Sequence, residues 1–334
     1  MNPSTESTIF IATRGSALAL AQSNQVLNRC RLEFPDLTFE LKIIRTTGDK
    51  LQNLSLTHSD QQLPKGLFTK ELEVSLLNGE ATLAVHSLKD LPTELPAGLK
   101  LAAVSPRADV RDVLITLAAQ PGPGTPGTPT QREPGTVTGA TVKDLSSGAT
   151  IATSSTRRQA QLLALRPDLN LVAIRGNVGT RLQKLAGRAE LDGLVLAAAG
   201  LERLGIRIGP EGVLGGEGVP PGLRAIFLSL DEMLPCVGQA ALGLETRIDD
   251  PRADRIAAGL NDLPTFQCVT GERAFLEAMG GGCMSPVACL GERVGGDLRL
   301  RAVTFRDQKT GRAEIIGDPG AARDLGRALA ETLR

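Results

Sequence analysis

Residues 8–34, TIFIATRGSALALAQSNQVLNRCRLEF, join two patterns that together decide the fold class. The apolar run Thr8–Thr13 is typical of a buried strand, and Ser16–Phe34 has helical spacing until Pro35 stops it. The same alternation continues with a strand, a helix and a strand expected at 39–45, 69–78 and 81–86. Because strands that alternate with helices usually lie parallel, we predict an α/β fold with mostly parallel strands.

The strand and turn of the opening stretch have a counterpart later in the chain. Ile151–Thr153 repeats the Ile-Ala-Thr of Ile11–Thr13, and each leads into a helix that contains glutamine. A short apolar strand follows in each half, at Leu83–Ser87 and at Leu194–Ala199. We interpret the two halves as similar α/β lobes. The alternative is convergent use of one strand-turn-helix pattern.

Two further regions complete the organisation of the chain. Pro121–Gly139 is rich in Pro, Gly and Thr and cannot bury a core, so we predict a disordered surface insertion. From about Leu263 the pattern gives a helix, a glycine-rich loop, strands and a final helix, expected at 271–278, near 298–305 and at 321–333. We expect this part to form a small third α/β domain.

The composition excludes several classes of function. The chain has 334 residues with 37 basic and 37 acidic side chains, which gives no overall bias toward nucleic acid or membranes. Its five cysteines are scattered without a CxxC pair, and two histidines cannot form a His-rich metal site, so we expect no metal. The polar stretch Met1–Thr8 lacks the apolar core of a signal peptide, and we expect a cytoplasmic protein.

Asp90 is the first candidate for catalysis. It lies in AVHSLKDLP, Ala84–Pro92, where a buried strand ends in polar residues. The carboxyl ends of strands are where α/β sheets place their ligands. A carboxylate there can act as a general acid or base and can stabilise a developing cation. The alternative is an ordinary loop ion pair between Lys89 and Asp90.

A set of arginines follows apolar strands at turns, and not on long solvated faces. Its members are Arg14, Arg157, Arg158, Arg175, Arg181 and Arg203. Guanidinium groups bind carboxylates with two hydrogen bonds, and helix N-termini add backbone donors. With no Trp, no Tyr and only 8 Phe, a ligand must be held mainly by charge and backbone. The set therefore indicates a ligand with many carboxylates or phosphates, although surface arginines are the usual alternative.

Two loops carry further candidates. Cys283 lies in GGGCMSP, Gly280–Pro286, where three glycines let the backbone approach a bulky group and a thiol could act as nucleophile or attachment point. The other cysteines have contexts that suggest inert thiols. Lys65 follows the polar stretch His58–Pro64, which could be a lid over a site or a simple surface loop before the next helix.

These segments, in this order, resemble the porphobilinogen deaminase (hydroxymethylbilane synthase) family. The resemblance spans nearly the whole chain and is carried by IATRGSALAL at 11–20, KGLFTKELE at 65–73, AVHSLKDLP at 84–92, ATSSTRRQAQL at 152–162, RGNVGTRLQKL at 175–185, CVGQAALGLE at 236–245 and GGGCMSP at 280–286.

The resemblance implies three α/β domains and a reaction. Two lobes like those of type II periplasmic binding proteins would enclose a cleft, and the third domain would carry the cofactor cysteine. The implied domains are 6–108 with about 240–260, then 109–239, then 263–334. The implied reaction condenses four porphobilinogen molecules head to tail with release of ammonia. The chain would grow on a dipyrromethane primer, bound to Cys283 through a thioether, and hydrolysis would release hydroxymethylbilane.

The resemblance also assigns roles to single residues. Asp90 would bind pyrrole nitrogens, stabilise the cation formed when ammonia leaves, and relay protons. The implied cofactor-binding residues are Cys283, Lys89, Asp90, Ser155, Arg157, Arg158 and Arg175. The implied substrate-binding residues are Arg14, Ser16, Lys65, Thr153, Asn177, Arg181, Arg203 and Gln239. The family resemblance further implies a monomer. From the balanced charge and the lack of an apolar run of membrane-spanning length, we expect neither a nucleic-acid nor a membrane partner.

This sequence departs from the family pattern in the lid region. Asn53 stands where the family commonly has aspartate, and Gln61 and Gln62 stand where a basic residue is often found. The insertion at 121–139 is also longer than usual. These differences concern the lid and a surface edge, and leave the expected reaction unchanged.

Two other classes of function compete with the deaminase. One is a two-lobed anion-binding protein without catalysis, which the lobes and arginines alone would support; the third domain with Cys283 speaks against it. The other is a phosphoribosyl-type transferase on a similar fold. It needs a phosphate-binding glycine loop, and RGNVGTR at Arg175–Arg181 is a poor match.

Overall fold

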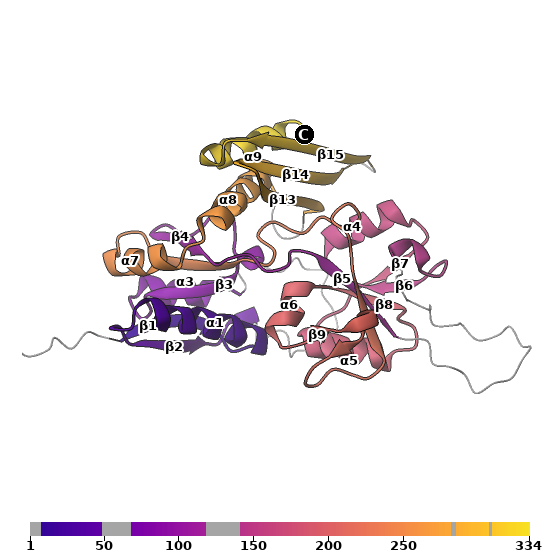
Figure 1. Cartoon of the computed structure of the whole chain (residues 1–334), viewed down its shortest axis with the longest axis horizontal. Coiled ribbons are helices and arrows are strands. Elements are labelled where there is room, and N and C mark those ends of the chain that lie inside the picture. The colour runs from indigo at the N-terminus through magenta and orange to yellow at the C-terminus, as the bar shows by residue number, and fades with distance from the viewer. Residues whose placement is uncertain (1–7, 49–67, 118–140, 282–284, 307–308) are drawn as a thin grey trace, which may run out of the picture.

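The computed structural model describes residues 8–48, 68–117, 141–281, 285–306 and 309–334 (Figure 1). The predicted insertion at 121–139 lies outside these residues, and so do Asn53, Gln61, Gln62, Lys65 and Cys283. Two lobes lie side by side and a smaller domain packs over them, near the top of Figure 1. The expected α/β architecture of two sheet-containing lobes and a small C-terminal domain is confirmed.

The first lobe is built on a mixed sheet with the order β2-β1-β3-β12-β4. Its strands are β1 (Ile9–Arg14), β2 (Phe39–Ile44), β3 (Leu83–Ser87), β4 (Leu99–Val104) and β12 (Leu242–Arg247). Its helices are α1 (Ala17–Glu33), α3 (Lys70–Leu77) and α7 (Pro251–Leu260). Both β12 and α7 come from sequence beyond the second lobe, so the chain returns to the first lobe after building the second.

The second lobe repeats this plan with the order β11-β5-β8-β6-β7. Its strands are β5 (Asp112–Leu117), β6 (Thr150–Ala152), β7 (Asn170–Val172), β8 (Gly193–Ala197) and β11 (Leu223–Phe227). A two-stranded ribbon is added by β9 (Arg207–Ile208) and β10 (Leu214–Gly215). Its helices are α4 (Thr156–Leu165), α5 (Val178–Gly187) and α6 (Ala198–Arg203).

The prediction of mostly parallel strands is wrong, because two of the four strand pairings in each lobe's sheet are antiparallel. β1 is parallel to β2 and β3, but β12 is antiparallel to both of its neighbours. The second lobe likewise pairs β6 in parallel, whereas β5 pairs antiparallel on both sides. The antiparallel strands β12 and β5 are those that arrive directly from the other lobe, without the preceding helix that makes a crossover between parallel strands.

The third domain is an antiparallel sheet of β13 (Val287–Val294), β14 (Asp297–Arg306) and β15 (Lys309–Gly317), with α8 (Leu263–Ala278) and α9 (Ala322–Glu331) packed on it. The predicted helix 271–278 begins earlier, at Leu263, because the Asp262 side chain caps it by accepting from the Thr265 N–H at 2.9 Å. Buried Phe275, Leu300 and Leu329 form the centre of its core. None of the helices in the described ranges combines the length and apolar character needed to cross a bilayer.

Two segments connect the lobes, residues 105–111 (the first crossover) and residues 228–241 (the second crossover). Both pass beneath the third domain (Figure 1). Apolar contacts join the third domain to these connections, since Leu234 of the second crossover packs with Ala288, Leu290 and Val303. Val269 of α8 packs likewise against Leu88 beside the catalytic candidate.

Ala240 in the second crossover has a left-handed backbone with φ of 72°. An L side chain is strained there, whereas glycine is not. We expect Ala240→Gly to raise the free energy of unfolding by about 0.5–1 kcal/mol, because relief of strain exceeds the entropy that glycine adds to the unfolded chain. Urea denaturation measures this change, and a lower stability would contradict it.

Gly238 supplies the matched control for this substitution. It has the same φ of 72°, and a Cβ there would lie 2.9 Å from Leu88 Cγ. Gly238→Ala should therefore lower the free energy of unfolding, opposite in sign to Ala240→Gly.

Candidate active site

A cavity of about 640 Å³ has walls from both lobes and the third domain. Ten of the predicted site residues line it: Arg14, Ser16, Lys89, Asp90, Ser155, Arg157, Arg158, Asn177, Arg181 and Gln239. They come from chain segments far apart in sequence. The sheets bring them together because most follow the carboxyl ends of β1, β3 and β6.

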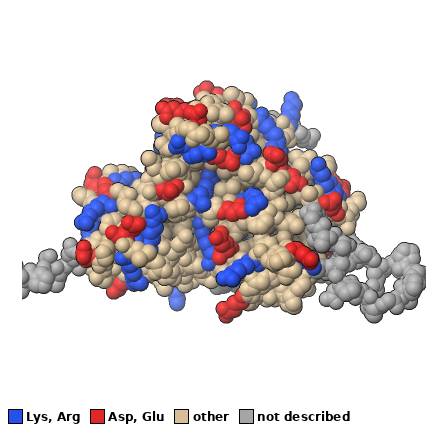
Figure 2. Space-filling view, viewed as in Figure 1, with Lys and Arg blue, Asp and Glu red and all other residues tan. Residues whose placement is uncertain are grey.

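The walls of this cavity are strongly basic. The lining includes six Arg or Lys residues, namely Arg14, Lys89, Arg157, Arg158, Arg181 and Arg273, against two acids, Asp90 and Glu217. On the face visible in Figure 2, by contrast, positive and negative side chains are interspersed. Since the whole chain is balanced at 37 and 37, the excess of positive charge is a property of the cavity. It suits a ligand with several carboxylates or phosphates.

Asp90 ends a short 3-10 turn, Leu88–Asp90, that follows β3. Leu88 and Leu91 are buried on either side of it, and the Leu88 N–H donates to the Ala241 carbonyl at 3.0 Å. These anchors fix the turn while the Asp90 side chain stays exposed on the cavity wall. The carboxylate can therefore meet a ligand directly.

The first lobe adds Arg14 and Ser16 to the wall. The Arg14 guanidinium lies 4.3 Å from the centre of the Phe68 ring, a cation–π contact that orients it. The Ser16 hydroxyl caps α1 by accepting from the Ala19 N–H at 3.3 Å. Its hydroxyl hydrogen can still be donated to a ligand.

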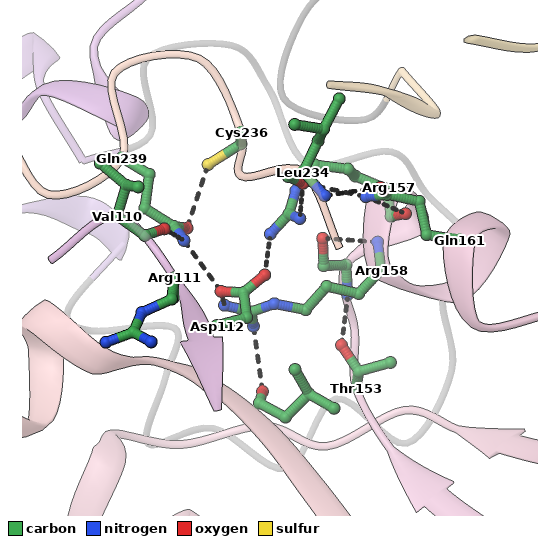
Figure 3. A network of polar contacts seen from close by, with 12 residues as sticks. Val110, Arg111, Asp112, Thr153, Arg157, Arg158, Gln161, Leu234, Cys236 and Gln239 are labelled. Carbon is green, nitrogen blue, oxygen red and sulfur yellow. Dashed lines mark hydrogen bonds and ion pairs between the residues drawn. The ribbon is translucent and has the colours of Figure 1, made fainter. Parts of the chain in front are cut away.

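Arg157 and Arg158 lie in the first turn of α4 and are buried. Their Nη2 atoms donate to the two oxygens of one carboxylate, Asp112, at 2.7 Å and 2.8 Å (Figure 3). Their Nη1 atoms donate to the Leu234 and Val195 carbonyls at 2.6 Å and 3.0 Å. Both arginines, predicted to bind ligand carboxylates, thus already share a protein carboxylate.

Asp112 is ionised in this setting. Its burial would raise the pKa, but the charges of Arg157 and Arg158 outweigh burial and hold the pKa of the Asp112 carboxyl well below its usual range. Burial opposes the charge of Arg158, and Asp112 in turn raises the pKa of that guanidinium. The three groups together carry one net positive charge.

Gln239 is fully buried, and its side-chain amide is engaged by protein groups. Its Nε2 donates to the Val110 carbonyl at 2.7 Å and to Asp112 Oδ1 at 2.9 Å. Its Oε1 accepts from Cys236 Sγ at 3.5 Å (Figure 3). Gln239, which the resemblance assigned to substrate binding, thus lines the cavity while its amide is already bonded to protein groups.

Asn177 and Arg181 lie at the N-terminus of helix α5. Asn177 is the N-cap of α5, and its side chain accepts from the Thr180 N–H at 2.8 Å. The asparagine cap starts α5 within the glycine-containing segment, which places Arg181 in its first turn. Burial and then the charge of Arg158 lower the pKa of Arg181, while Asp90 opposes this effect.

Three predicted residues are absent from the described cavity lining. Thr153 is buried, and its hydroxyl accepts from the Ser155 N–H at 3.3 Å. Arg175 is exposed at the surface. Arg203 donates from Nη2 to the Ala240 carbonyl at 2.5 Å, so it joins α6 to the second crossover, and burial lowers its pKa.

The predicted cofactor cysteine lies next to the cavity in sequence. Cys283 is outside the described residues, but Ser285 and Val287, which follow it, line the cavity. Of the other cysteines, Cys30, Cys268 and Cys289 are buried, whereas Cys236 is half-buried and lines the cavity, so the expectation of an inert context is wrong for Cys236. Burial raises the pKa of Cys30 to about 12 and of Cys268 to about 11, which agrees with inert thiols.

Sequence reasoning missed Arg273 and Asp112. Arg273 of α8 lines the cavity and donates from Nη1 to the Leu91 carbonyl at 3.1 Å, and from Nη2 to the Thr93 carbonyl at 3.1 Å. It therefore ties the third domain to the loop after Asp90. Its neighbours in sequence, Glu272 and Ala274, form no motif, so only the tertiary structure identifies it.

Comparison with known proteins gives two family matches. Residues 9–255 match the family model described as porphobilinogen deaminase, dipyromethane cofactor binding domain. Residues 266–334 match the model of the porphobilinogen deaminase C-terminal domain. Together the two matches cover nearly all of the chain and both lobes as well as the third domain.

Curated relatives agree with these matches. The chain is similar to porphobilinogen deaminase of Thermus thermophilus, with 42% identity over 325 residues, 96% of this chain and 94% of that protein. It is also similar to porphobilinogen deaminase of Syntrophus aciditrophicus, with 42% identity over 97% of this chain and 94% of that protein. The enzyme of Deinococcus deserti has 40% identity, over 97% of this chain and 94% of that protein.

Solved structures give a more distant likeness. The effector-binding domain of BenM with benzoate has a TM-score of 0.42 and 13% identity, over 79% of this chain and 95% of that one. On the full-length sequence matches, the chain belongs to the porphobilinogen deaminase family, transferases that make hydroxymethylbilane on a dipyrromethane cofactor.

Proposed function

We propose that the condensation of porphobilinogen takes place in the cavity between the lobes, with Asp90 as the catalytic carboxylate. The observation that carries this proposal is the presence, in one cavity, of the exposed Asp90 side chain among six basic residues. Porphobilinogen carries acetate and propionate groups, so a growing chain gains carboxylates at every addition. A wall of cations matches that ligand.

The residues of the cavity fit the dipyrromethane cofactor. Two linked pyrroles have ring N–H groups, which can donate hydrogen bonds to an exposed carboxylate such as Asp90. They also carry carboxylates, which guanidinium groups can bind. Apolar side chains that also line the cavity, among them Leu18, Val178 and Leu196, suit the faces of the rings. When bound through a thioether to Cys283, the cofactor supplies the pyrrole position to which the first substrate is joined.

We assign Asp90 three tasks in each cycle. Its carboxylate accepts hydrogen bonds from pyrrole N–H groups and orients the incoming ring against the chain. Loss of ammonia leaves an electron-poor pyrrole, and a carboxylate fixed beside it stabilises the positive charge. The same group can take up the proton that is released when the new bond forms.

We assign the basic residues to binding of the carboxylates. Arg14 and Arg181 face the cavity from opposite lobes and can hold substrate carboxylates between them. Arg157 and Arg158 keep one net positive charge beside Asp112, and each has a buried Nε atom without a hydrogen-bond partner among the described residues. Lys65 and Arg175 remain proposals from the resemblance alone.

Intact mass of the denatured protein tests this function, with Cys283→Ser as control. We expect an excess that equals one dipyrromethane on the parent protein and its loss in the control, since serine cannot form the thioether. If the parent mass is unmodified, incubation with porphobilinogen should add the excess. A parent protein that stays unmodified and consumes no porphobilinogen would contradict the proposal.

We also propose that the enzyme works as a cytoplasmic monomer on small-molecule substrates. The family resemblance supports the monomer. The interspersed charges on the surface in Figure 2 and the balance of 37 basic and 37 acidic residues support the absence of a nucleic-acid partner.

A further inference from the structure

Among the residues that the structure describes, Asp112 is the acid that contacts both buried arginines of the cavity wall, and the roles proposed above assign it no function. It begins β5, its side chain has no exposure, and it is not among the residues that line the cavity. It therefore cannot touch the substrate. Whatever it contributes to the reaction must act through Arg157 and Arg158.

The carboxylate fixes the orientation of both guanidinium groups. Each arginine is held at two points, with Nη2 on Asp112 and Nη1 on a backbone carbonyl. Two anchors on a planar group define its plane and leave little rotation. The carbonyl partners differ, since Leu234 belongs to the second crossover and Val195 to β8. One carboxylate thus aligns two neighbouring arginines of α4, whose second hydrogen bonds go to different parts of the fold.

Asp112 also makes the buried arginine pair electrostatically possible. Arg157 and Arg158 are both more than nine-tenths buried, with exposures of 4% and 7%. Two like charges that share a buried wall without an anion would repel each other and stay uncompensated. With Asp112 between them, one positive charge is left for ligands. The wall keeps its attraction for carboxylates without the cost of two unpaired cations.

Gln239 links this cluster to both crossovers. It reaches Asp112 Oδ1, the oxygen that Arg158 also uses, and the Val110 carbonyl of the first crossover (Figure 3). Gln239 itself lies on the second crossover. Asp112 is therefore fixed by the connections between the lobes, and the arginines are fixed by Asp112.

We propose that Asp112 is a positioning residue for the condensation reaction: it holds Arg157 and Arg158 in the orientation that binds the carboxylates of the cofactor and the growing chain. The proposal rests on the function proposed above.

The test compares Asp112→Asn, Asp112→Glu and the control Leu169→Ala. Asparagine keeps the shape but removes the charge, whereas glutamate keeps the charge and displaces it by one methylene. Leu169 is buried in the second lobe, outside the cavity lining and the Asp112 cluster, so its truncation destabilises the same lobe without touching the arginines. Thermal unfolding first sets a temperature at which every variant is folded.

We expect kcat/KM for porphobilinogen to fall by about 10- to 100-fold in Asp112→Asn, by analogy with the loss seen when a residue that orients a metal ligand is replaced. Asp112→Glu should lie between that variant and the parent. Leu169→Ala should keep the parent kcat and KM per folded molecule. Intact mass should also show stalled, partly extended chains in Asp112→Asn and none in Leu169→Ala.

Parent-like kcat, KM and chain masses in folded Asp112→Asn would overturn the proposal. If that variant does not fold, Asp112→Glu decides, since parent-like constants there would overturn it and a clear loss would support it. If Asp112→Asn is isolated without dipyrromethane while Leu169→Ala carries the cofactor, that result also supports the proposal. Failure of the underlying function has a different signature, because the parent protein itself would then consume no porphobilinogen.

Discussion

Asp90→Asn is expected to lower kcat by about 10²–10⁴-fold, the usual contribution of a positioned proton-transfer group. Asparagine keeps the size and the oxygen acceptor, but it neither stabilises a cation by charge nor takes up a proton. Because the Asp90 side chain is exposed on the cavity wall, the free energy of unfolding should change by less than about 0.5 kcal/mol. The variant therefore separates chemistry from stability.

Porphobilinogen consumption and urea denaturation of the same preparation measure both quantities. Glu217→Gln is the matched control, since Glu217 is the other acidic residue among the described cavity lining. It should cause a much smaller loss than Asp90→Asn. Equal losses in the two variants would mean that activity depends only on the total negative charge in the cavity, and would contradict the catalytic role proposed for Asp90.

Glu272→Gln is expected to destabilise the fold by about 3–5 kcal/mol, the usual effect of removing one partner of a buried ion pair. Glu272 of α8 has no exposure and accepts from Arg107 at 2.5 Å and 3.0 Å. It also accepts from the N–H groups of Gly238 and Gly291 at 2.7 Å and 2.8 Å. Burial opposes the charge of Arg107, but Glu272 raises its pKa, so neutralising Glu272 leaves a buried cation.

The free energy of unfolding from urea denaturation measures this effect. Asp168→Asn is the control, because Asp168 forms a 2.7 Å ion pair with Arg166 and is 36% exposed. A surface pair contributes about 0–1 kcal/mol, so this variant should stay close to the parent. Similar losses of unfolding free energy in Glu272→Gln and Asp168→Asn would contradict the larger contribution expected from the buried ion pair.

Local sequence patterns predicted elements better than their pairing. The strand and helix of residues 8–34 were predicted correctly because an apolar run, helical spacing and Pro35 are local signals. The direction of β12 was not predictable in this way, since Leu242–Arg247 has the same composition whether it pairs in parallel or not. Pairing depends on the return of the chain from the second lobe, which is a property of the whole topology.

The candidate site shows the same division. Asp90 could be found because it follows a buried strand, and the family resemblance supplied its expected role. Asp112 could not, since Arg111 and Asp112 look like a surface charge pair in the sequence. Only tertiary contacts reveal that Arg157 and Arg158 converge on Asp112 from a helix of the same lobe. Buried polar networks of this kind have no signature in spacing.

The position of β12 in the first sheet has a consequence for the order of events during synthesis. β12 lies between β3 and β4, yet it leaves the ribosome only after the whole second lobe. The strands of the second lobe all lie within Asp112–Phe227, so that lobe can close while the first sheet still lacks its fourth strand. Domains usually fold in the order in which they are made.

Here the N-terminal lobe can be completed only after the second lobe, because β12 and α7 follow that lobe in the sequence. The turn that carries Asp90 is fixed in part by the bond from the Leu88 N–H to the Ala241 carbonyl, which a nascent chain gains only late in translation. The strands of the arginine-bearing lobe are thus complete before the turn that carries Asp90 is fixed.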